Sequence, residues 1–146
     1  ADMWLDTNPY EVAMGYAWMV DLDQEADFVG KEALRQIKEA GVKRKLVGVE
    51  IGGKKLGSYI DGTMIDFFPI YANDEQIGNV TSACYSPRLE KNIGYAMLPI
   101  EFTQPGTEVG VETPDERTSA IVVSRPFIDP QKEIPKQDLV AAANDD

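Results

Sequence analysis

The sequence predicts a mainly β protein, with a short α/β segment at its N-terminal end followed by a small six-stranded barrel or sandwich. Two observations indicate this fold class. After Gly41 the apolar residues recur with a period of two, and Gly, Pro, Asn and Asp separate the resulting short segments. Six such segments within roughly 80 residues are typical of a small barrel or sandwich and not of βαβ units. The 146 residues suffice for one packed domain and scarcely for two.

The segment before Gly41 begins with a helix-start pattern. Asn8 is placed as an N-cap, Pro9 occupies the first helical position, and Glu11 follows three residues after the cap. We therefore expect a short helical turn here. From Tyr16 to Val20 larger apolar residues alternate with Ala and Met, which predicts a buried strand, and the polar run that follows predicts a loop.

The range Lys31–Ala40 is the predicted helix, because its apolar residues fall at helical spacing. Gly30 precedes the helix as a cap, and Gly41 supplies the residue at which it ends. Val29 is expected to pack onto Leu34 across the cap, as in a hydrophobic staple.

Six segments rich in Val, Ile and aromatic residues are the predicted strands. Two connections, residues 73–76 and 114–116, consist of residue types that tolerate turn dihedrals, so hairpin turns are predicted there. Cys84 lies within a predicted strand and is expected to be a small buried hydrophobic residue. The predicted strands are Leu46–Ile51, Thr63–Tyr71, Ile77–Tyr85, Asn92–Leu98, Thr107–Thr113 and Arg117–Ser124.

The composition excludes several classes of function. The formal net charge of -11 argues against nucleic acids and anionic membranes as partners. The chain contains no histidine, which excludes Ser-His-Asp and Cys-His catalysis and any metal site that needs imidazole. Cys84 is the only cysteine, so we predict no thiolate metal site, no intrachain disulfide and a reducing, cytoplasmic location. No apolar run approaches the roughly 20 residues that cross a bilayer.

Three further features were interpreted from residue type alone. The basic run Lys43-Arg44-Lys45 is interpreted as a solvated strand edge that lysine protects from aggregation. Four large aromatic residues fall within the first 18 residues, and they either pack against a neighbouring domain or stack on a flat heteroaromatic ligand. The start, Ala-Asp-Met-Trp, leads us to expect a piece cut from a longer chain.

An ordered set of motifs resembles a known family. The motifs are Asn8-Pro9-Tyr10-Glu11 through Tyr16, residues 27–34, and residues 77–94, followed by Pro105-Gly106-Thr107 and Arg125-Pro126-Phe127. In this order and spacing they resemble the C-terminal part of the aminomethyltransferase family, which includes the T-protein of the glycine cleavage system. The resemblance covers residues 1 to about 128.

The resemblance implies a tetrahydrofolate-dependent transfer of a one-carbon unit, with the folate held in a cavity between three domains. Residues 1–44 would be the incomplete end of the folate-binding middle domain, 45–128 the C-terminal β-barrel, and 129–146 a flexible tail. The family's catalytic aspartate lies upstream, so no catalytic residue is predicted in this chain, which is expected to be inactive by itself. The implied partners are the missing N-terminal domains and a lipoyl carrier protein.

The resemblance also implies cofactor-binding residues. Tyr10 and Glu11 match the family's Pro-x-Glu motif near the cavity, where Glu11 would meet the donor edge of the pterin ring. The alternative role for Glu11 is to cap the turn at Asn8.

A second group of candidates comes from the family's Thr-Ser-x-x-x-Ser-Pro signature. Thr81, Ser82 and Arg88 match or adjoin it, as ligand contacts or as structural residues of the barrel wall. Ala83 stands where the family commonly has glycine, which puts a close approach of a ligand to the backbone in doubt.

Two other functions remain open at this stage. The chain could belong to a folate-dependent demethylase or dehydrogenase of the same family, because the substrate is determined upstream. It could also be a non-enzymatic β-barrel that binds a partner protein through its apolar N-terminal segment. Exposure of Tyr16 and Trp18 would indicate a covering partner or domain.

Overall fold

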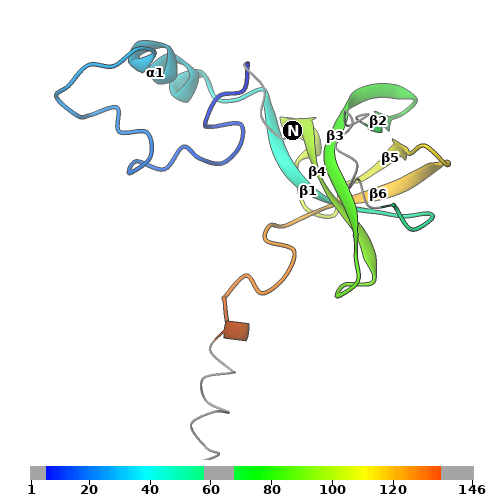
Figure 1. The fold of residues 1–146 in the computed structure, drawn as a ribbon. Coiled ribbons are helices and arrows are strands. Elements are labelled where there is room, and N and C mark those ends of the chain that lie inside the picture. The colour runs from blue at the N-terminus through cyan, green and yellow to red at the C-terminus, as the bar shows by residue number, and fades with distance from the viewer. Residues whose placement is uncertain (1–5, 58–67, 136–146) are drawn as a thin grey trace, which may run out of the picture.

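The computed structural model describes residues 6–57 and 68–135 (Figure 1). An N-terminal segment, residues 6–43, contains the helix α1 (Lys31–Ala40) and lies to one side of a β-barrel formed by residues 44–123. The barrel elements are β1 (Arg44–Ile51), β2 (Phe68–Ala72), β3 (Glu75–Ser86), β4 (Lys91–Pro99), the short 3-10 helix η1 (Ile100–Phe102), β5 (Glu108–Glu112) and β6 (Arg117–Val123).

The six strands form a closed antiparallel barrel in the order β1-β4-β3-β2-β5-β6. Strand β1 pairs with β4 along its whole length, from Arg44 opposite Pro99 to Ile51 opposite Asn92. Only the second half of β1, from Gly48, pairs with β6, and this contact closes the barrel. The prediction of a mainly β chain with a six-stranded barrel and a short helix is therefore confirmed.

Alternating inward-facing residues fill the barrel. Strand β4 shows the pattern clearly, because Asn92, Gly94, Ala96 and Leu98 are buried while the residues between them are more exposed. The core consists of Val47, Val49, Ile51, Leu56, Phe68, Ile70, Val80, Ala96, Leu98, Val109, Val111, Ala120 and Val122.

A bulge in β3 makes the prediction for Cys84 wrong. The register between β3 and β4 shifts between Val80 and Ser82, so Thr81 is the extra residue. Past a bulge, the residues that face the core change parity. Ala83 accordingly packs against the core, and Cys84 is exposed on the outside of the barrel.

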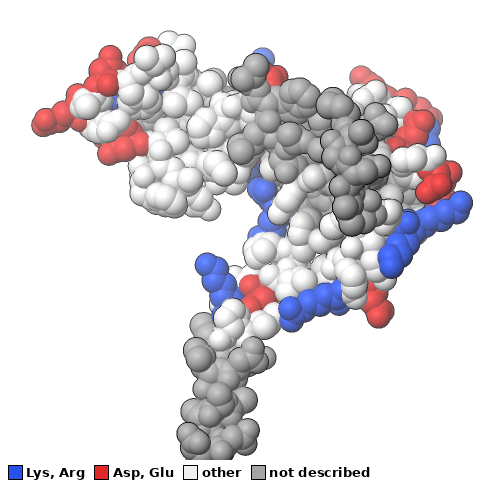
Figure 2. Space-filling view, viewed as in Figure 1, with Lys and Arg blue, Asp and Glu red and all other residues white. Residues whose placement is uncertain are grey.

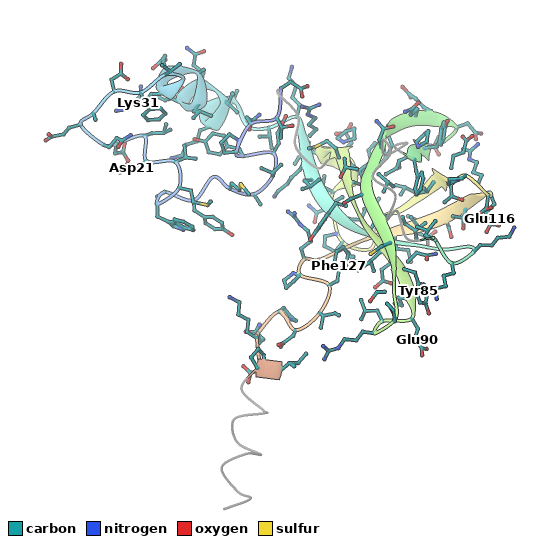
Figure 3. The ribbon with its side chains drawn as sticks, in the orientation of Figure 1. Asp21, Lys31, Tyr85, Glu90, Glu116 and Phe127 are labelled. Atoms are coloured by element: carbon teal, nitrogen blue, oxygen red, sulfur yellow. The ribbon has the colours of Figure 1, made fainter. Side chains whose placement is uncertain are left out.

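The chain after β6 covers the outer face of β1. Gly48 is buried because Phe127 and Arg125 lie directly over it, and a Cβ at Gly48 would lie 3.0 Å from Phe127 Cε1. The Phe127 ring, labelled in Figure 3, also packs on the Tyr95 ring with 5.5 Å between centroids. The centre of β1 is thus covered on both faces, by the barrel core and by this crossing segment.

The predicted strand over residues 16–20 is wrong. These residues form an exposed turn in which the Tyr16 carbonyl accepts hydrogen bonds from the amides of Met19 and Val20, at 2.8 and 2.9 Å. Trp18 is 79% exposed, and its ring stacks on that of Tyr16. A strand needs a neighbour to pair with its backbone groups, and no described strand pairs with this segment.

Helix α1 has the predicted bounds, with Gly30 and Gly41 at its ends in left-handed or otherwise positive-φ conformations. The predicted staple is wrong, because Val29 is fully exposed and does not cover Leu34. The helix buries none of its residues completely. Within the described part of the chain, no helix combines the length and apolar character needed to cross a membrane.

Both predicted hairpin turns are confirmed. Asn73 and Asp74 adopt positive φ values of 49° and 64° between β2 and β3. In the β5–β6 turn, the Thr113 hydroxyl donates to the Glu116 carbonyl at 2.8 Å. The first part of the predicted strand 63–71 and the end of the predicted tail, residues 136–146, lie outside the described residues.

Candidate functional site

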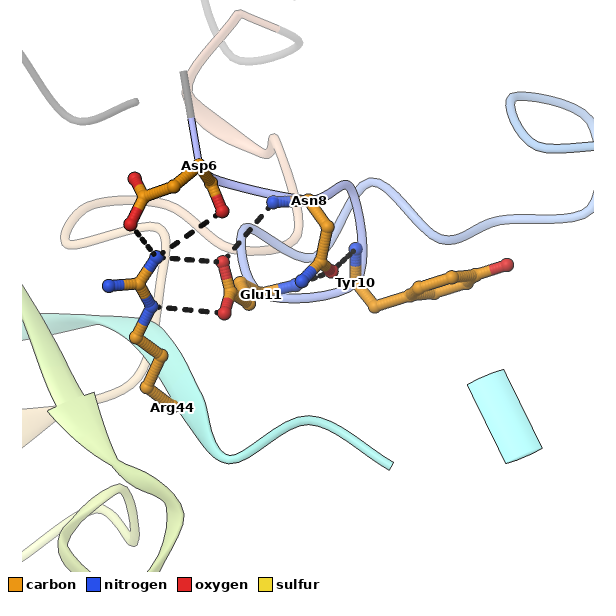
Figure 4. Close-up of polar contacts among 5 residues, drawn as sticks. All are labelled: Asp6, Asn8, Tyr10, Glu11 and Arg44. Carbon is orange, nitrogen blue, oxygen red and sulfur yellow. Dashed lines mark hydrogen bonds and ion pairs between the residues drawn. The ribbon is translucent and has the colours of Figure 1, made fainter. Parts of the chain in front are cut away.

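The turn at residues 8–13, which is hydrogen-bonded but not assigned as helix, meets the start of β1 at a cluster of polar side chains (Figure 4). The Asn8 Oδ1 atom accepts hydrogen bonds from the amides of Tyr10 and Glu11, at 3.1 and 3.2 Å. The Glu11 carboxylate reaches back to accept from the Asn8 amide at 3.2 Å. These reciprocal bonds form a capping box, as the sequence pattern of the turn predicts. The capping role of Glu11 is therefore present in the structure.

Glu11 also joins the turn to the barrel. Its backbone carbonyl accepts from the Leu46 amide at 2.8 Å, and its carboxylate faces the guanidinium of Arg44. Arg44 Nε lies 3.0 Å from Oε1 and Nη2 lies 3.4 Å from Oε2. The Glu11 side chain is only 10% exposed, whereas that of Arg44 is 38% exposed. The carboxylate is thus nearly buried at the junction, with a cation on its solvent side.

Arg44 has a second acidic partner. Its Nη2 atom lies 3.1 Å from Asp6 Oδ2, at an exposed position. The hydrogen bonds that Arg44 donates, first to Glu11 and to a smaller extent to Asp6, raise the pKa of its guanidinium above its usual value, against the opposing effect of burial. Arg44 therefore stays charged and is held between two carboxylates of the N-terminal segment.

Tyr10 points away from this ion pair (Figure 4). Its ring packs closely against the backbone of Gly15, where any side chain would collide with it. The Tyr10 hydroxyl is buried without a hydrogen-bond partner among the described residues. An orphaned buried hydroxyl is costly, so it marks a position that another polar group would satisfy.

Thr81 and Ser82 lie on β3, halfway along the barrel. Ser82 is opposite Tyr95, which is in turn opposite Gly48 in the middle of β1. The buried Thr81 hydroxyl donates to the Tyr95 carbonyl at 3.3 Å. The contact that is described for Thr81 is therefore internal to the barrel wall, at the bulge.

Arg88 lies at the opposite end of the barrel from Glu11. It is exposed in the turn between β3 and β4, beyond the point where Ile51 pairs with Asn92. Seven residues of strand separate Arg44 from Ile51, which corresponds to roughly 23 Å. Figure 3 shows Tyr85 and Glu90 of this hairpin well away from the N-terminal segment. Tyr10 and Glu11 are neighbours in the sequence, and the fold does not bring Arg88 close to them.

Charge is distributed unevenly over these regions (Figure 2). Acidic side chains gather over the loop before α1, where Asp21, Asp23 and Glu25 are exposed. Lysine and arginine line the end of the barrel that carries the β3–β4 hairpin, where Lys55 and Lys91 are exposed. The cation of Arg44 lies apart from both regions, at the junction.

Sequence reasoning missed two residues that matter to this architecture. Arg44 was interpreted as part of a solvated strand edge, and no local pattern connects it to Glu11, 33 positions earlier. Asn92 was placed in a strand without a role. It is buried, accepts from the Leu56 amide at 2.9 Å and donates to the Lys54 carbonyl at 2.9 Å, so it anchors the loop after β1. An asparagine among inward-facing apolar residues was the signal that could have identified it.

The barrel corresponds to a known domain. The family model described as the glycine cleavage T-protein C-terminal barrel domain matches residues 44–129, more than half of the chain. The chain belongs to the glycine cleavage T-protein, or aminomethyltransferase, family. The family resemblance predicted from the sequence motifs is confirmed.

Full-length relatives share this similarity. An aminomethyltransferase of Bacillus cytotoxicus is 40% identical over 122 residues, and one of a Geobacillus species is 41% identical, each covering 84% of this chain. The chain spans 31% of the length of both relatives. The glycine cleavage system aminomethyltransferase T of Bartonella henselae has the same fold, with a TM-score of 0.71 and 25% identity. That match covers 87% of this chain and 34% of the other. The chain therefore corresponds to about the last third of such a protein.

Proposed function

We propose that this chain is the C-terminal part of a tetrahydrofolate-dependent enzyme that transfers a one-carbon unit, and that it is inactive as an isolated piece. Membership in the aminomethyltransferase family supports this proposal, as does the one-third coverage of relatives that carry that name. A folate site needs walls on several sides, and this chain would supply only some of them. Bound tetrahydrofolate would accept or carry the one-carbon unit, and the chain's own residues would bind and orient the pterin.

The observation that carries the proposal is the nearly buried carboxylate of Glu11 in the family's Pro-x-Glu motif. The N–H groups of a pterin ring are hydrogen-bond donors, and an ionised carboxylate is an acceptor for them. The carboxylate accepts three described hydrogen bonds, one from Asn8 and two from Arg44. An ionised carboxylate has about four acceptor positions. Capping and ligand binding are therefore compatible in Glu11, which fits the cofactor.

Tyr10 would supply a second contact, on the side of the turn that faces away from the ion pair of Glu11 and Arg44. Its buried hydroxyl lacks a described partner, so a polar group of a ligand or of another domain would fit against it. We keep Thr81, Ser82 and Arg88 as proposed cofactor contacts of lower rank, because they lie along the barrel and at its far end. A lipoyl carrier protein as partner and a cytoplasmic location also remain proposals.

Titration calorimetry with tetrahydrofolate tests this function. The complete polypeptide that contains this sequence is expected to bind one equivalent, and the 146-residue chain is expected to bind weakly or not at all. In the complete polypeptide, Glu11→Ala is expected to raise Kd about tenfold or more, as the loss of a charge-assisted hydrogen bond would. Glu32→Ala on the exposed face of α1 is the matched control and should leave Kd unchanged. Unchanged folate affinity in Glu11→Ala with a lower melting temperature would leave Glu11 with its capping role alone.

A second candidate function is a non-enzymatic module that binds a partner protein. The exposed stack of Tyr16 and Trp18 favours it, because solvated aromatic pairs of this kind often mark contact surfaces. The intact mass of the native polypeptide separates the two functions. A chain about three times as long supports the enzyme, and a native chain of this size supports the partner-binding module.

A further inference from the structure

Arg44 is the strongest candidate for a functional residue that neither the motifs nor the family match assigns. It is the first residue of β1, and its side chain crosses from the barrel to the N-terminal segment. Among the described residues, it is the one cation in hydrogen-bond contact with Glu11. The two-point contact, Nε to Oε1 and Nη2 to Oε2, fixes the plane of the carboxylate as well as its position.

The hydrogen bonds from Asn8 and Arg44 also determine which acceptor position of the Glu11 carboxylate is left for a further donor. Among the described residues, Oε2 accepts from both the Asn8 amide and Arg44 Nη2, whereas Oε1 accepts from Arg44 Nε alone. With about two acceptor positions on each oxygen, the remaining one lies on Oε1. A donor of a ligand would therefore meet Oε1, in the orientation that Arg44 imposes.

Asp6 holds the guanidinium in this place. Its carboxylate contacts Arg44 Nη2 at 3.1 Å, and its backbone carbonyl lies 3.5 Å from the same atom. The anchor restricts rotation of Arg44 toward solvent, which a side chain that is 38% exposed would otherwise allow. The three charged side chains thus form one network with Glu11 at its buried end.

We propose that Arg44 is a positioning residue for pterin binding: its guanidinium holds the Glu11 carboxylate in the orientation that presents Oε1 to the ligand. This inference rests on the proposed function, because it requires that Glu11 bind the folate. Arg44 itself need not touch the ligand. Lysine would supply the charge but not the planar two-point contact.

The test measures the tetrahydrofolate Kd and the melting temperature of the complete polypeptide in a double-mutant cycle. Arg44→Met is expected to raise Kd about tenfold, the size of a typical coupling in a charge-assisted pair. Arg44→Lys is expected to recover part of that loss. In the Glu11→Gln background, Arg44→Met should change Kd less than about twofold while still lowering the melting temperature. Arg35→Met, which removes an arginine from the exposed ion pair on α1, is the matched control.

The outcomes separate the inference from the function on which it rests. If Glu11→Gln weakens binding but Arg44→Met leaves Kd unchanged, Arg44 is only structural and the inference is wrong, while the proposed function stands. An equal loss of affinity in both Glu11 backgrounds also overturns it, because Arg44 would then act independently of Glu11. If the complete wild-type polypeptide does not bind tetrahydrofolate, the proposed function fails first. If the Arg44→Met variant does not fold, Arg44→Lys is measured in its place, in the wild-type and Glu11→Gln backgrounds, and the two changes in Kd are compared.

Discussion

Thirteen apolar residues form one buried cluster inside the barrel, whereas the ten-residue helix of the N-terminal segment buries none of its residues completely. The barrel strands pair with one another in a closed ring, and at the start of β1 the Leu46 amide donates instead to the Glu11 carbonyl of the N-terminal segment. The N-terminal segment instead leaves Met14, Tyr16, Trp18 and Met19 exposed. The barrel therefore has its own core, while the N-terminal segment has apolar surface that the described residues do not cover.

The same leucine-to-alanine change in each region gives the largest expected contrast. Leu98→Ala empties a fully buried position in β4 and is expected to lower the free energy of unfolding by about 3 kcal/mol. Leu34→Ala in α1 removes only a half-buried side chain, and alanine has the higher helix propensity. The free energy of unfolding is therefore expected to fall by less than about 1 kcal/mol. Urea unfolding followed by circular dichroism measures both. Equal losses of unfolding free energy in the two variants would mean that Leu34 is packed as tightly as Leu98 in the barrel core.

Two glycines differ in how closely other backbone atoms approach them. A Cβ at Gly94 would lie 2.5 Å from the Ser82 carbonyl oxygen, and this backbone atom cannot move without disturbing the β3–β4 pairing. Gly94→Ala is therefore expected to cost about 2 kcal/mol of unfolding free energy. Gly57→Ala is the control, because a Cβ there would meet no described atom within 4 Å beyond its chain neighbours, and it should stay within about 0.5 kcal/mol. A neutral Gly94→Ala would mean that the close strand contact is not required.

Local stability in the N-terminal segment depends on the capping box. Asn8→Ala removes the acceptor for the amides of Tyr10 and Glu11 and is expected to cost about 1 kcal/mol locally. Hydrogen exchange of these two amides should accelerate about fivefold. The amide of Val49 in the barrel is the internal control, since it should be unaffected. Faster exchange throughout the barrel would show that the two regions unfold together.

The smallest effect is expected at Trp18. Because the side chain is 79% exposed, Trp18→Ser should change the stability of this chain by less than about 0.5 kcal/mol. In the complete polypeptide, covering of Trp18 by another domain would raise that cost to about 2 kcal/mol or more. Thermal unfolding of both proteins, with and without the substitution, makes the comparison. The same small effect in both would mean that Trp18 stays exposed in the whole protein.

The elements that follow from local pattern were predictable. Helix α1 begins and ends at its flanking glycines. Each barrel strand whose predicted range is fully described lies within two residues of that range, because period-two alternation and turn residues are short-range signals. The predicted strand at residues 16–20 failed because its local pattern needed a distant partner. The run from Tyr16 to Val20 alternates like a strand, but no described strand pairs with it.

The contacts of the candidate site also differ in how far apart the contacting residues lie in the sequence. The capping contact between Asn8 and Glu11 spans three residues, so the sequence could indicate it. The pairing of Glu11 with Arg44 spans 33 residues and depends on where the first turn meets β1. The distance of Arg88 from this junction likewise follows only from the barrel register.

Local sequence patterns predicted the fold class, the helix, the barrel strands, the turns and the family, because periodicity, turn chemistry and ordered motifs are local properties of the chain. Tertiary structure decided which residues face the core past the bulge at Thr81, and so placed Cys84 outside. It also decided that Arg44 holds Glu11. A single added residue reverses the side on which every later side chain of a strand lies, and an ion pair forms only between groups that the fold brings together.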